Sequence, residues 1–468
     1  MVGRVGVVLG FAVVATLFSG SAAAATTDSA APVIVVARGL PPVAVTVTAG
    51  RAGEAVLTLM ADAPGVSWAV SGRESAVVSV DVDGHYVSDL VVFSARPTPR
   101  EVALGALSTG RHTVRFRFAA DRSAPSAHLV RLAGLRLSLA AQNQTAIVRR
   151  HAPVLIGRSL AQFGGPTQNA RTDTPLLAWH EAVDGPVEGQ RRLTYSVVWS
   201  NEDGGTDSPG LMARWGRTTD IEWVYSVVVD AHGQRVPDQA FYHGPNHQKL
   251  AFAGRYEGDH PLLQTCSDYN SMCDVLTGAT MRFALPADET RPIRRAREYL
   301  MDVHPWSYRV MAEEMLREGK VEDPSDPATP AMGDHRTYLY LEVDKDTGSP
   351  PESGTAPGVS IVVRLRGDPA DYRSDHAQAS WAIARDDPAA TTVELPSGVG
   401  RDDIERIDVI RVPLGTEDNG APITVTDLNR AFFLDSNWRP DSSFAESHGL
   451  SLRLDPSTPT ATIWKGSI

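Results

Sequence analysis

The chain has 468 residues and a formal net charge of −12 at pH 7, with 56 acidic residues against 44 Lys and Arg. A surface this acidic disfavours nucleic acid and anionic membranes as partners. A chain of this length exceeds what one hydrophobic core supports, so we expect two or three domains.

The N-terminus has the three parts of a secretory signal peptide. Arg4 precedes an apolar run over 5–18, and small residues follow up to an Ala-x-Ala pattern ending at Ala25. We expect cleavage near Ala25 and secretion, with an uncleaved anchor as the alternative. The basic residues are almost all Arg, which is typical of GC-rich bacterial genomes. No later stretch reaches the ~20 apolar residues of a membrane-spanning helix, so we expect no transmembrane segment after processing.

Residues 30–145 are predicted to form a β-sandwich of jelly-roll type. The stretch from Val43 alternates apolar and polar residues, as a strand with one buried face does. Asp83-Gly84 lies between two alternating runs and predicts a two-residue hairpin. In "HTVRFRF", Val114, Phe116 and Phe118 share one face. Short strands separated by Gly and Pro turns are typical of sandwiches.

Residues 151–468 are predicted to form a larger β-rich main domain with a few helices. We expect strands over 193–200, 221–229 and 338–343, and a helix over 307–317 whose apolar residues recur at helical spacing. Glu313 and Arg317 could form a pair one helical turn apart, and Gly319 would end the helix. The Pro-, Gly- and Ser-rich stretch 345–358 is either a domain boundary or, as we prefer, a long loop between paired strands.

The two cysteines enclose a short polar loop. Cys266 and Cys273 are spaced unlike a zinc motif or a redox C-x-x-C motif. In an oxidising compartment such a pair forms a structural disulfide. The sequence also lacks G-x-S-x-G, H-E-x-x-H, the P-loop and G-x-G-x-x-G, which argues against the commonest serine hydrolases, zincins, P-loop enzymes and dinucleotide enzymes.

The strand predicted at 221–229 opens with two carboxylates. Asp220 and Glu222 would share one face about 7 Å apart at their Cα atoms, while Ile221, Trp223 and Tyr225 would anchor the opposite face in the core. Such carboxylates can divide acid and base roles, which requires no cofactor. They can instead hold a hard cation such as calcium. A solvated strand face with a salt bridge is the alternative.

Other polar and aromatic residues near these carboxylates complete the candidate site. His243 and His247 are candidate acid or base groups, because loop residues beside a cleft often do chemistry. The Gly-rich acidic loop "SNEDGGTD", which also holds Asp203, could contact sugar hydroxyls or calcium. The candidate substrate-binding residues are Asn201, Trp215, Arg217 and Trp306. We also expect Arg217 to pair with one of the two carboxylates.

Parts of the chain resemble known families. "GALSTGRHTVRFRFAAD" with "VRLAGLRLSL" resembles the late strands of jelly-roll carbohydrate-binding modules. The stretch from "HAPVLIGR" to "HPWSYRVMAEEMLREGK" resembles a group of uncharacterised secreted bacterial proteins. "HAPV" and the later Asp220-Ile221-Glu222 are similar to "HAPV" and Asp-Trp-Glu in necrosis-inducing-like and vacuolar-sorting-related β-sandwich proteins. This chain has Thr218-Thr219 where that group has a histidine.

These observations favour a secreted carbohydrate-active protein, a polysaccharide hydrolase or lyase with an accessory sandwich. Its partner would be an extracellular glycan or cell-surface polymer, and no nucleic acid. A non-catalytic protein that binds glycans or cell surfaces is the first alternative. The resemblance to the necrosis-inducing group implies the second, a secreted effector that acts on membranes.

Overall fold

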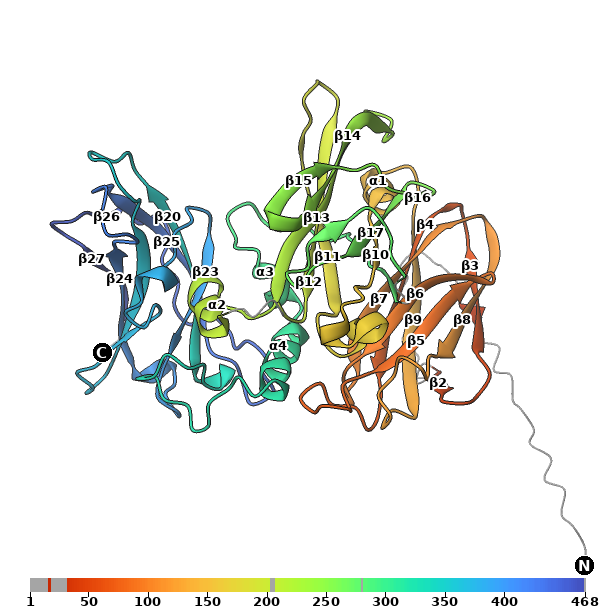
Figure 1. Ribbon diagram of the computed structural model, residues 1–468, viewed down its shortest axis with the longest axis horizontal. Coiled ribbons are helices and arrows are strands. Elements are labelled where there is room, and N and C mark those ends of the chain that lie inside the picture. The colour runs from red at the N-terminus through yellow and green to blue at the C-terminus, as the bar shows by residue number, and fades with distance from the viewer. Residues whose placement is uncertain (1–15, 18–31, 203–206, 279–280, 467–468) are drawn as a thin grey trace, which may run out of the picture.

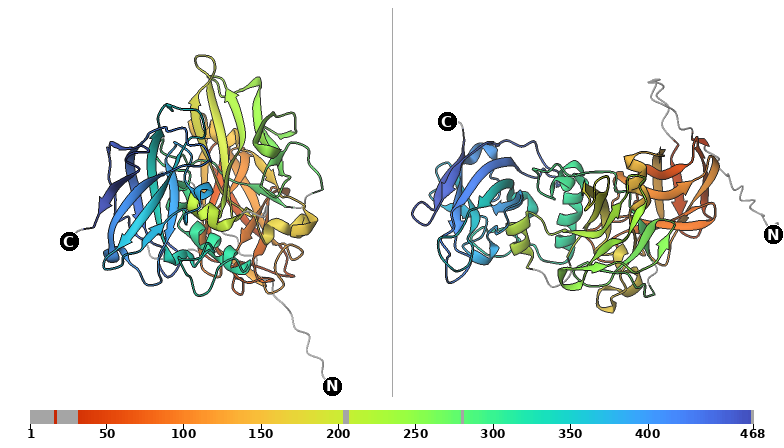
Figure 2. Two further views of the ribbon diagram at one scale, coloured as in Figure 1. Left: turned by 60° about the vertical axis from the view of Figure 1, so that its left-hand side comes forward. Right: turned by 90° about the horizontal axis from the view of Figure 1, so that it is seen from above.

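The computed structural model describes residues 16–17, 32–202, 207–278 and 281–466. Apart from β1 (Thr16–Leu17), the predicted signal peptide lies outside these residues. The chain forms three sections in a row, with the N-terminal section at one end and the C-terminal section at the other (Figures 1 and 2). Antiparallel strands dominate every section, so the predicted mostly β class is confirmed.

The N-terminal section is a sandwich of two sheets around its own core, as predicted. Val47, Leu57, Val80 and Phe116 are buried in that core. One sheet has the order β1, β3 (Val43–Ala49), β8 (Gly110–Phe118), β5 (Ala76–Val82), β6 (His85–Val92). The other has the order β2 (Ile34–Ala37), β9 (Leu129–Ala140), β4 (Gly53–Asp62), β7 (Thr98–Leu107).

Two local predictions for this sandwich are confirmed. Asp83 and Gly84 have φ angles of 50° and 88° and join β5 to β6 as a two-residue turn. Positive φ at both positions matches the right-handed twist of the strands it joins. Val114, Phe116 and Phe118 of β8 are 0, 0 and 7% exposed, which makes this the core face of the strand.

Among the described residues, the middle section carries two sheets and the four α-helices. Helix α1 (Gln144–His151) leads into it from the sandwich, and α2 (Ser208–Trp215), α3 (Tyr299–Val303) and α4 (Trp306–Arg317) follow. The smaller sheet has the order β16 (Tyr256–Glu257), β17 (His260–Thr265), β10 (Val154–Ile156), β19 (Arg282–Ala284), and β18 (Met272–Cys273) also pairs with β17. The larger sheet runs in chain order through β11 (Pro175–Asp184), β12 (Arg191–Trp199), β13 (Asp220–Val229), β14 (Arg235–Gly244), β15 (Gln248–Ala251).

Helix α4 confirms the predicted helix and corrects two of its details. Gly319 follows it with a φ of 67°, and its N–H donates to the carbonyl of Leu316, as expected for a glycine that ends a helix. Leu316 is 40% exposed, so the expectation that the apolar residues of this helix all face the core is wrong at this position. The pairing of Glu313 with Arg317 is also wrong, because Glu313 binds Arg309 at 2.7 Å.

The C-terminal section is a second sandwich with its own core, so the predicted main domain divides in two. Leu341, Val363, Val409 and Ile423 lie in that core. One sheet has the order β23 (Ala389–Glu394), β20 (Tyr338–Thr347), β25 (Ile423–Phe432), β26 (Leu452–Leu454). The other has the order β22 (Asp371–Arg373), β21 (Gly358–Leu365), β24 (Ile404–Val412), β27 (Thr460–Lys465).

The stretch 345–358 is a loop between β20 and β21 together with the ends of those strands. The two strands belong to different sheets of the sandwich and do not pair with each other. The expectation that the flanking strands pair is therefore wrong, because the loop crosses from one sheet to the other.

The core of the middle section extends into both sandwiches. Trp68 of the N-terminal sandwich and Phe432 of the C-terminal one belong to the same buried cluster as Tyr308 of α4. Trp68 is fully buried, and its indole N–H donates to Glu314 of α4 at 2.9 Å. Among the described residues, no helix has the length and apolar character needed to cross a bilayer.

Candidate functional site

The two predicted carboxylates lie at the start of β13, the central strand of the larger sheet. Asp220 lies opposite Trp199 of β12, and Glu222 lies opposite Val197. Directly opposed residues share a face of an antiparallel pair, and both partners on β12 are buried. The strand face that carries the two acids is therefore largely buried.

A β-bulge changes which residues of β13 share a face. Tyr195 lies opposite Tyr225, whereas its neighbour Ser196 lies opposite Trp223, so Val224 is an extra residue. An extra residue reverses the alternation beyond it. Tyr225 therefore lies on the face of the acids, and the predicted anchoring face is wrong at this position. Trp223 is also only half-buried, so it is not a core anchor.

A buried polar network surrounds Asp220, which is 3% exposed. The side-chain amide of Asn270 donates to its Oδ2 at 3.0 Å. The same nitrogen lies 3.1 Å from Oδ1 of Asp173 and 3.2 Å from the carbonyl oxygen of Asn201. Asp173 forms a fully buried ion pair with Arg158. This network holds the Asp220 carboxyl away from bulk water in one orientation.

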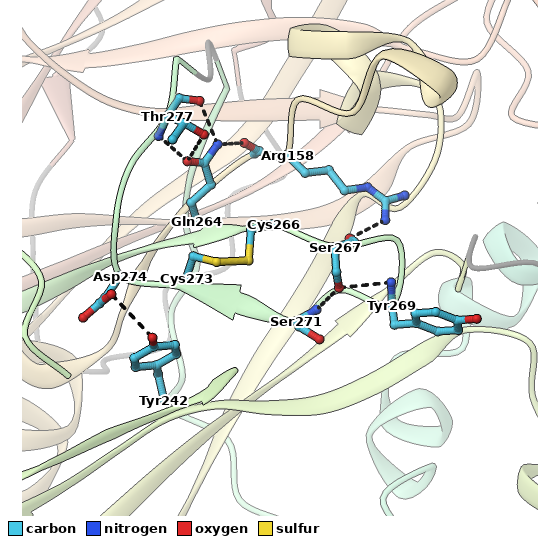
Figure 3. The surroundings of a disulfide bond; sticks show 11 residues. Arg158, Tyr242, Gln264, Cys266, Ser267, Tyr269, Ser271, Cys273, Asp274 and Thr277 are labelled. Carbon is cyan, nitrogen blue, oxygen red and sulfur yellow. Dashed lines mark hydrogen bonds between the residues drawn. A yellow bond between two sulfur atoms is a disulfide. The ribbon is translucent and has the colours of Figure 1, made fainter. Parts of the chain in front are cut away.

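The predicted disulfide is present and encloses the residue that contacts Asp220. Cys266 and Cys273 are bonded, and Asn270 lies in the loop between them with a φ of 51°. Arg158 donates to the carbonyl of Ser267 in the same loop at 3.0 Å, as Figure 3 shows. The disulfide therefore fixes a loop that is part of the wall around Asp220.

We expect removal of this bridge to weaken the fold and loosen the site. The double variant Cys266→Ser/Cys273→Ser should lower the free energy of unfolding by about 2–3 kcal/mol, because the closed loop is short and restricts the unfolded chain. Urea unfolding of both proteins measures the loss. An unchanged midpoint would show that the bridge does not constrain the folded loop.

Glu222 is the carboxylate that solvent reaches, with 22% of its side chain exposed. Its Oε2 lies 3.7 Å from Nδ1 of His243 and 3.9 Å from Nη1 of Arg297. Nε2 of His243 lies 3.3 Å from Nδ1 of His247, and the His243 ring lies 5.1 Å from that of Trp223. The structure therefore brings both predicted histidines beside Glu222.

The two histidines meet through a tight turn and not through a helix. His243 is on β14, and residues 245–247 turn the chain into β15 with positive φ at Asn246 and His247. His243 is buried and His247 is exposed. Burial lowers the pKa of His243, and the charge of Glu222 opposes this effect. His243 is therefore a neutral imidazole near neutral pH.

A third carboxyl group, Glu202, interacts with the pair. Burial, and then the charges of Glu222 and Glu202, raise the pKa of Asp220 well above its usual value. Burial also raises the pKa of Glu202, with Glu222 contributing and Arg217 opposing. Three neighbouring carboxyl groups cannot all ionise without cost, so the cluster retains a proton. Asp203, from the same predicted loop, lies outside the described residues.

The raised pKa of Asp220 predicts how stability depends on pH. A carboxyl group that holds its proton more tightly when folded stabilises the protein at acid pH, and this contribution is lost as pH rises through the folded pKa. Asp220→Asn should therefore match the wild type in Tm near pH 4.5 and exceed it by a few degrees near pH 8. Asp184→Asn, on an exposed position of β11, is the control. A Tm difference between Asp220→Asn and the wild type that is the same at every pH would contradict the raised pKa of Asp220.

The predicted substrate-binding residues Trp215 and Arg217 lie in a cluster of arginines beside this site. Guanidinium carbons of Arg385, Arg297 and Arg217 lie 3.8, 5.2 and 5.5 Å from the centre of the Trp215 ring. Arg217 binds Glu298 at 2.7 Å, so its expected pairing with Asp220 or Glu222 is wrong. Although burial opposes the change, the charges of Arg217, Arg385 and Arg297 lower the pKa of Glu298. Cation–π contacts already occupy the indole.

The remaining two predicted residues have other surroundings. Trp306, at the start of α4, stacks on Phe93 of the N-terminal sandwich at 5.6 Å and lies 5.4 Å from Arg100. It therefore joins two sections of the chain and is not part of the carboxyl cluster. Asn201 is 2% exposed, and its amide donates to Glu318 at 2.8 Å. Its backbone oxygen contributes to the network around Asp220.

The candidate site contains residues that sequence reasoning missed. Asn270, Asp173 and Arg297 approach it from segments more than 40 positions away from Asp220 and Glu222, and no sequence motif links them. The position of Asn270 inside the disulfide loop was the one available signal. Among the described residues, no group of three or more His, Cys, Asp or Glu side chains is arranged to hold a metal ion. Calcium binding stays a prediction.

The fold and site define a class in structural terms: a mostly β protein with two terminal sandwiches and a buried carboxyl–histidine cluster between them. No family model and no curated protein matches the chain. Among solved structures, the sugar-binding EclA C-terminal domain is 16% identical over 24% of this chain and 81% of its own, with a TM-score of 0.17.

Two further solved structures are similar to this chain to the same low degree. The CBM36-1 domain of a xylanase from the hindgut metagenome of Trinervitermes trinervoides is 14% identical over 21% of this chain and 76% of its own, with a TM-score of 0.17. A cycloisomaltooligosaccharide glucanotransferase from Paenibacillus sp. is 11% identical over 53% of this chain and 40% of its own, also at 0.17. Scores this low place the chain in no family, so its function has to be argued from its own residues.

Proposed function

We propose that this protein is a secreted carbohydrate-active enzyme, a polysaccharide hydrolase or lyase, whose chemistry is carried out by the carboxyl cluster of β13. The observation that carries the proposal is the contrast between two acids on one face of one strand. Asp220 is buried and retains a proton, whereas Glu222 has solvent access and lies near His243 and Arg297. Enzymes separate acid from base roles by placing two carboxyl groups in such unequal surroundings.

Glu222 would be the group that touches a substrate, because solvent reaches its side chain. Cleavage of a glycosidic bond needs a proton for the leaving oxygen and a base that activates water, or in a lyase a base that removes a proton from the sugar. Glu222 would act directly, and Asp220 would share the proton with it. His243 lies beside Glu222 as a neutral imidazole, and the half-buried Trp223 ring offers an apolar surface next to it.

Secretion is part of the same proposal. The residues of the signal-peptide pattern, the Cys266–Cys273 bridge and the acidic net charge all suit an extracellular protein that meets a polymer. The N-terminal sandwich would then be an accessory module, fixed to the middle section through Trp68.

A polysaccharide panel tests the proposal. The full secreted chain is incubated with neutral, acidic and amino-sugar polymers, and new reducing ends and unsaturated products are measured. The expected result is turnover of at least one polymer, with hydrolysis or elimination identified by the product. Retention on a polymer without any product would favour the glycan-binding alternative and reject the enzyme. Leakage of liposomes without either result would favour the membrane-active alternative.

A further inference from the structure

A small cavity lies where the N-terminal sandwich meets the middle section. It has a volume of about 90 Å³ and is lined by β7 of the sandwich, by β11, by the segment 285–289 and by the start of α4. This is room for several water molecules or for one small organic ligand. Much of the lining is apolar and consists of Pro99, Leu176, Leu177, Ala178, Leu285 and Pro286.

Arg100 of β7 brings a buried cation without a partner to this cavity. The residue is 7% exposed, and its Nε is enclosed without a hydrogen bond. Its two Nη atoms make no hydrogen bond or ion pair with any residue that the structure describes. The guanidinium carbon lies 5.0 Å from the centre of the Phe93 ring and 5.4 Å from that of Trp306, and Trp306 lines the same cavity. Because Nε is enclosed, the Nη atoms are the polar atoms of this side chain that reach the cavity.

An unpaired charge in these surroundings is costly. Burial lowers the pKa of Arg100 to about 10, with the charge of Glu101 opposing, so the guanidinium is still charged at neutral pH. The two aromatic rings offset part of the cost through cation–π contacts. A buried charge nevertheless destabilises a fold unless an opposite charge or hydrogen-bond acceptors replace its lost hydration. An anion in the cavity would supply both.

The start of α4 is a second positive feature of the same cavity. The helix has 12 residues, and its first turn has neither a side-chain cap nor an acidic residue. The first N–H groups of a helix lack partners within it and carry partial positive charge. His304 and Trp306, at this end of the helix, both line the cavity. The helix end and the guanidinium come from different sections of the chain and favour the same sign of ligand charge.

The acids on the lining do not reverse this sign. Asp288 pairs with Arg149 at 2.5 Å, and Glu289 pairs with His304 at 2.8 Å. Glu101 is exposed to solvent, and the alternation of β7 directs its side chain away from the buried face of the strand. The unpaired charge that is enclosed at the cavity is therefore positive.

We propose that this cavity binds a short-chain carboxylate of the size of acetate, with its oxygens on the Nη atoms of Arg100 and its alkyl group against the leucines and prolines of the lining. A guanidinium and a carboxylate form two parallel hydrogen bonds, which a monatomic anion cannot form. The apolar lining favours an anion with an alkyl group over a strongly hydrated inorganic ion. The site is separate from β13, so it does not depend on the proposed enzyme activity.

Saturation-transfer NMR of the full chain with sodium acetate tests the site, with acetamide as a neutral analogue of the same shape. Acetate should bind, and acetamide should bind at least about tenfold more weakly, because it lacks the charge that complements the guanidinium. Acetate should also raise the Tm, since it binds only the folded chain, whereas acetamide at the same concentration should not. Displacement of acetate by an equal concentration of chloride would overturn the assignment to a carboxylate.

Matched variants assign the binding to Arg100. Arg100→Met should lose at least about tenfold in affinity for acetate, whereas Arg136→Met, at an exposed position of β9 in the same sandwich, should not change it. Glu222→Gln should also retain binding, which separates this site from the enzyme proposal. Arg100→Lys keeps the charge without the fork of donors, so it should weaken binding severalfold, and it decides the matter if Arg100→Met does not fold. No acetate binding at millimolar concentration, equal binding of acetamide, or unchanged binding by the Arg100 variants would overturn the proposal and leave a cavity that holds only water.

Discussion

Glu222→Gln is expected to lower kcat on the responsive polysaccharide by about 10²–10⁴-fold, because it removes the solvent-accessible carboxylate that lies beside His243 and Arg297. Its melting temperature should stay near that of the wild type, since the amide keeps the shape of the side chain. Steady-state kinetics beside a thermal melt measure the two effects.

Two comparison variants complete this experiment. Asp220→Asn should reduce kcat less than Glu222→Gln does. It should also move to lower pH the limb of the pH–rate profile that Asp220 and Glu222 control, because the repulsion between the two carboxylates, which favours keeping a shared proton, is then absent. Glu188→Gln, on an exposed loop between β11 and β12, should keep full activity. If Glu222→Gln turns over substrate like the Glu188→Gln protein, the cluster is not the active site.

The second large effect concerns stability at the junction of the middle section and the C-terminal sandwich. Arg430 of β25 is 5% exposed and pairs with Asp302 of α3 and, at 3.4 Å, with Glu342 of β20. It also donates to the Tyr308 hydroxyl of α4 at 3.4 Å. Arg430→Met should lower the free energy of unfolding by about 3 kcal/mol, because Asp302 and Glu342 would then share the partly exposed Arg295, at 3.5 and 2.9 Å, in place of two cations.

Denaturant unfolding with a matched control checks this expectation. Arg453→Met removes the same side chain from β26, the strand paired with β25, where 63% of it is exposed. It should change stability by less than about 1 kcal/mol. Adding Glu342→Gln to Arg430→Met should restore part of the loss, since only one of the two negative charges beside Arg295 then remains. Equal losses from Arg430→Met and Arg453→Met would contradict the assigned role.

Local features of the fold could be predicted because neighbouring residues decide them. The Asp83-Gly84 turn depends on two positive φ angles, and the alternation through Val114 and Phe116 depends on the two-residue period of a strand. The helix at 306–317 was found within one residue for the same reason. The bulge at Val224 was not, because a bulge is a property of two paired strands and the pattern of one strand does not show it.

The candidate site was predicted in part. Asp220, Glu222, His243 and His247 do meet, although the acids and the histidines come from separate segments of the chain. Trp306 does not join them, because its place at the start of α4 puts it against Phe93 of another section. A list of polar and aromatic residues in one region of a chain does not say which of them a fold brings together.

Residue types and short-range spacing were enough to predict the strand class, the helix, the disulfide partners and the acidic charge. The enclosure of Asp220 by Asn270 and Asp173 and the pairing of Arg217 with Glu298 are visible only in the folded chain. These contacts depend on which strands pair and which loops meet across more than 40 positions. The pKa of a carboxyl group follows from burial and from charges that such contacts bring near, and the linear order of residues contains neither.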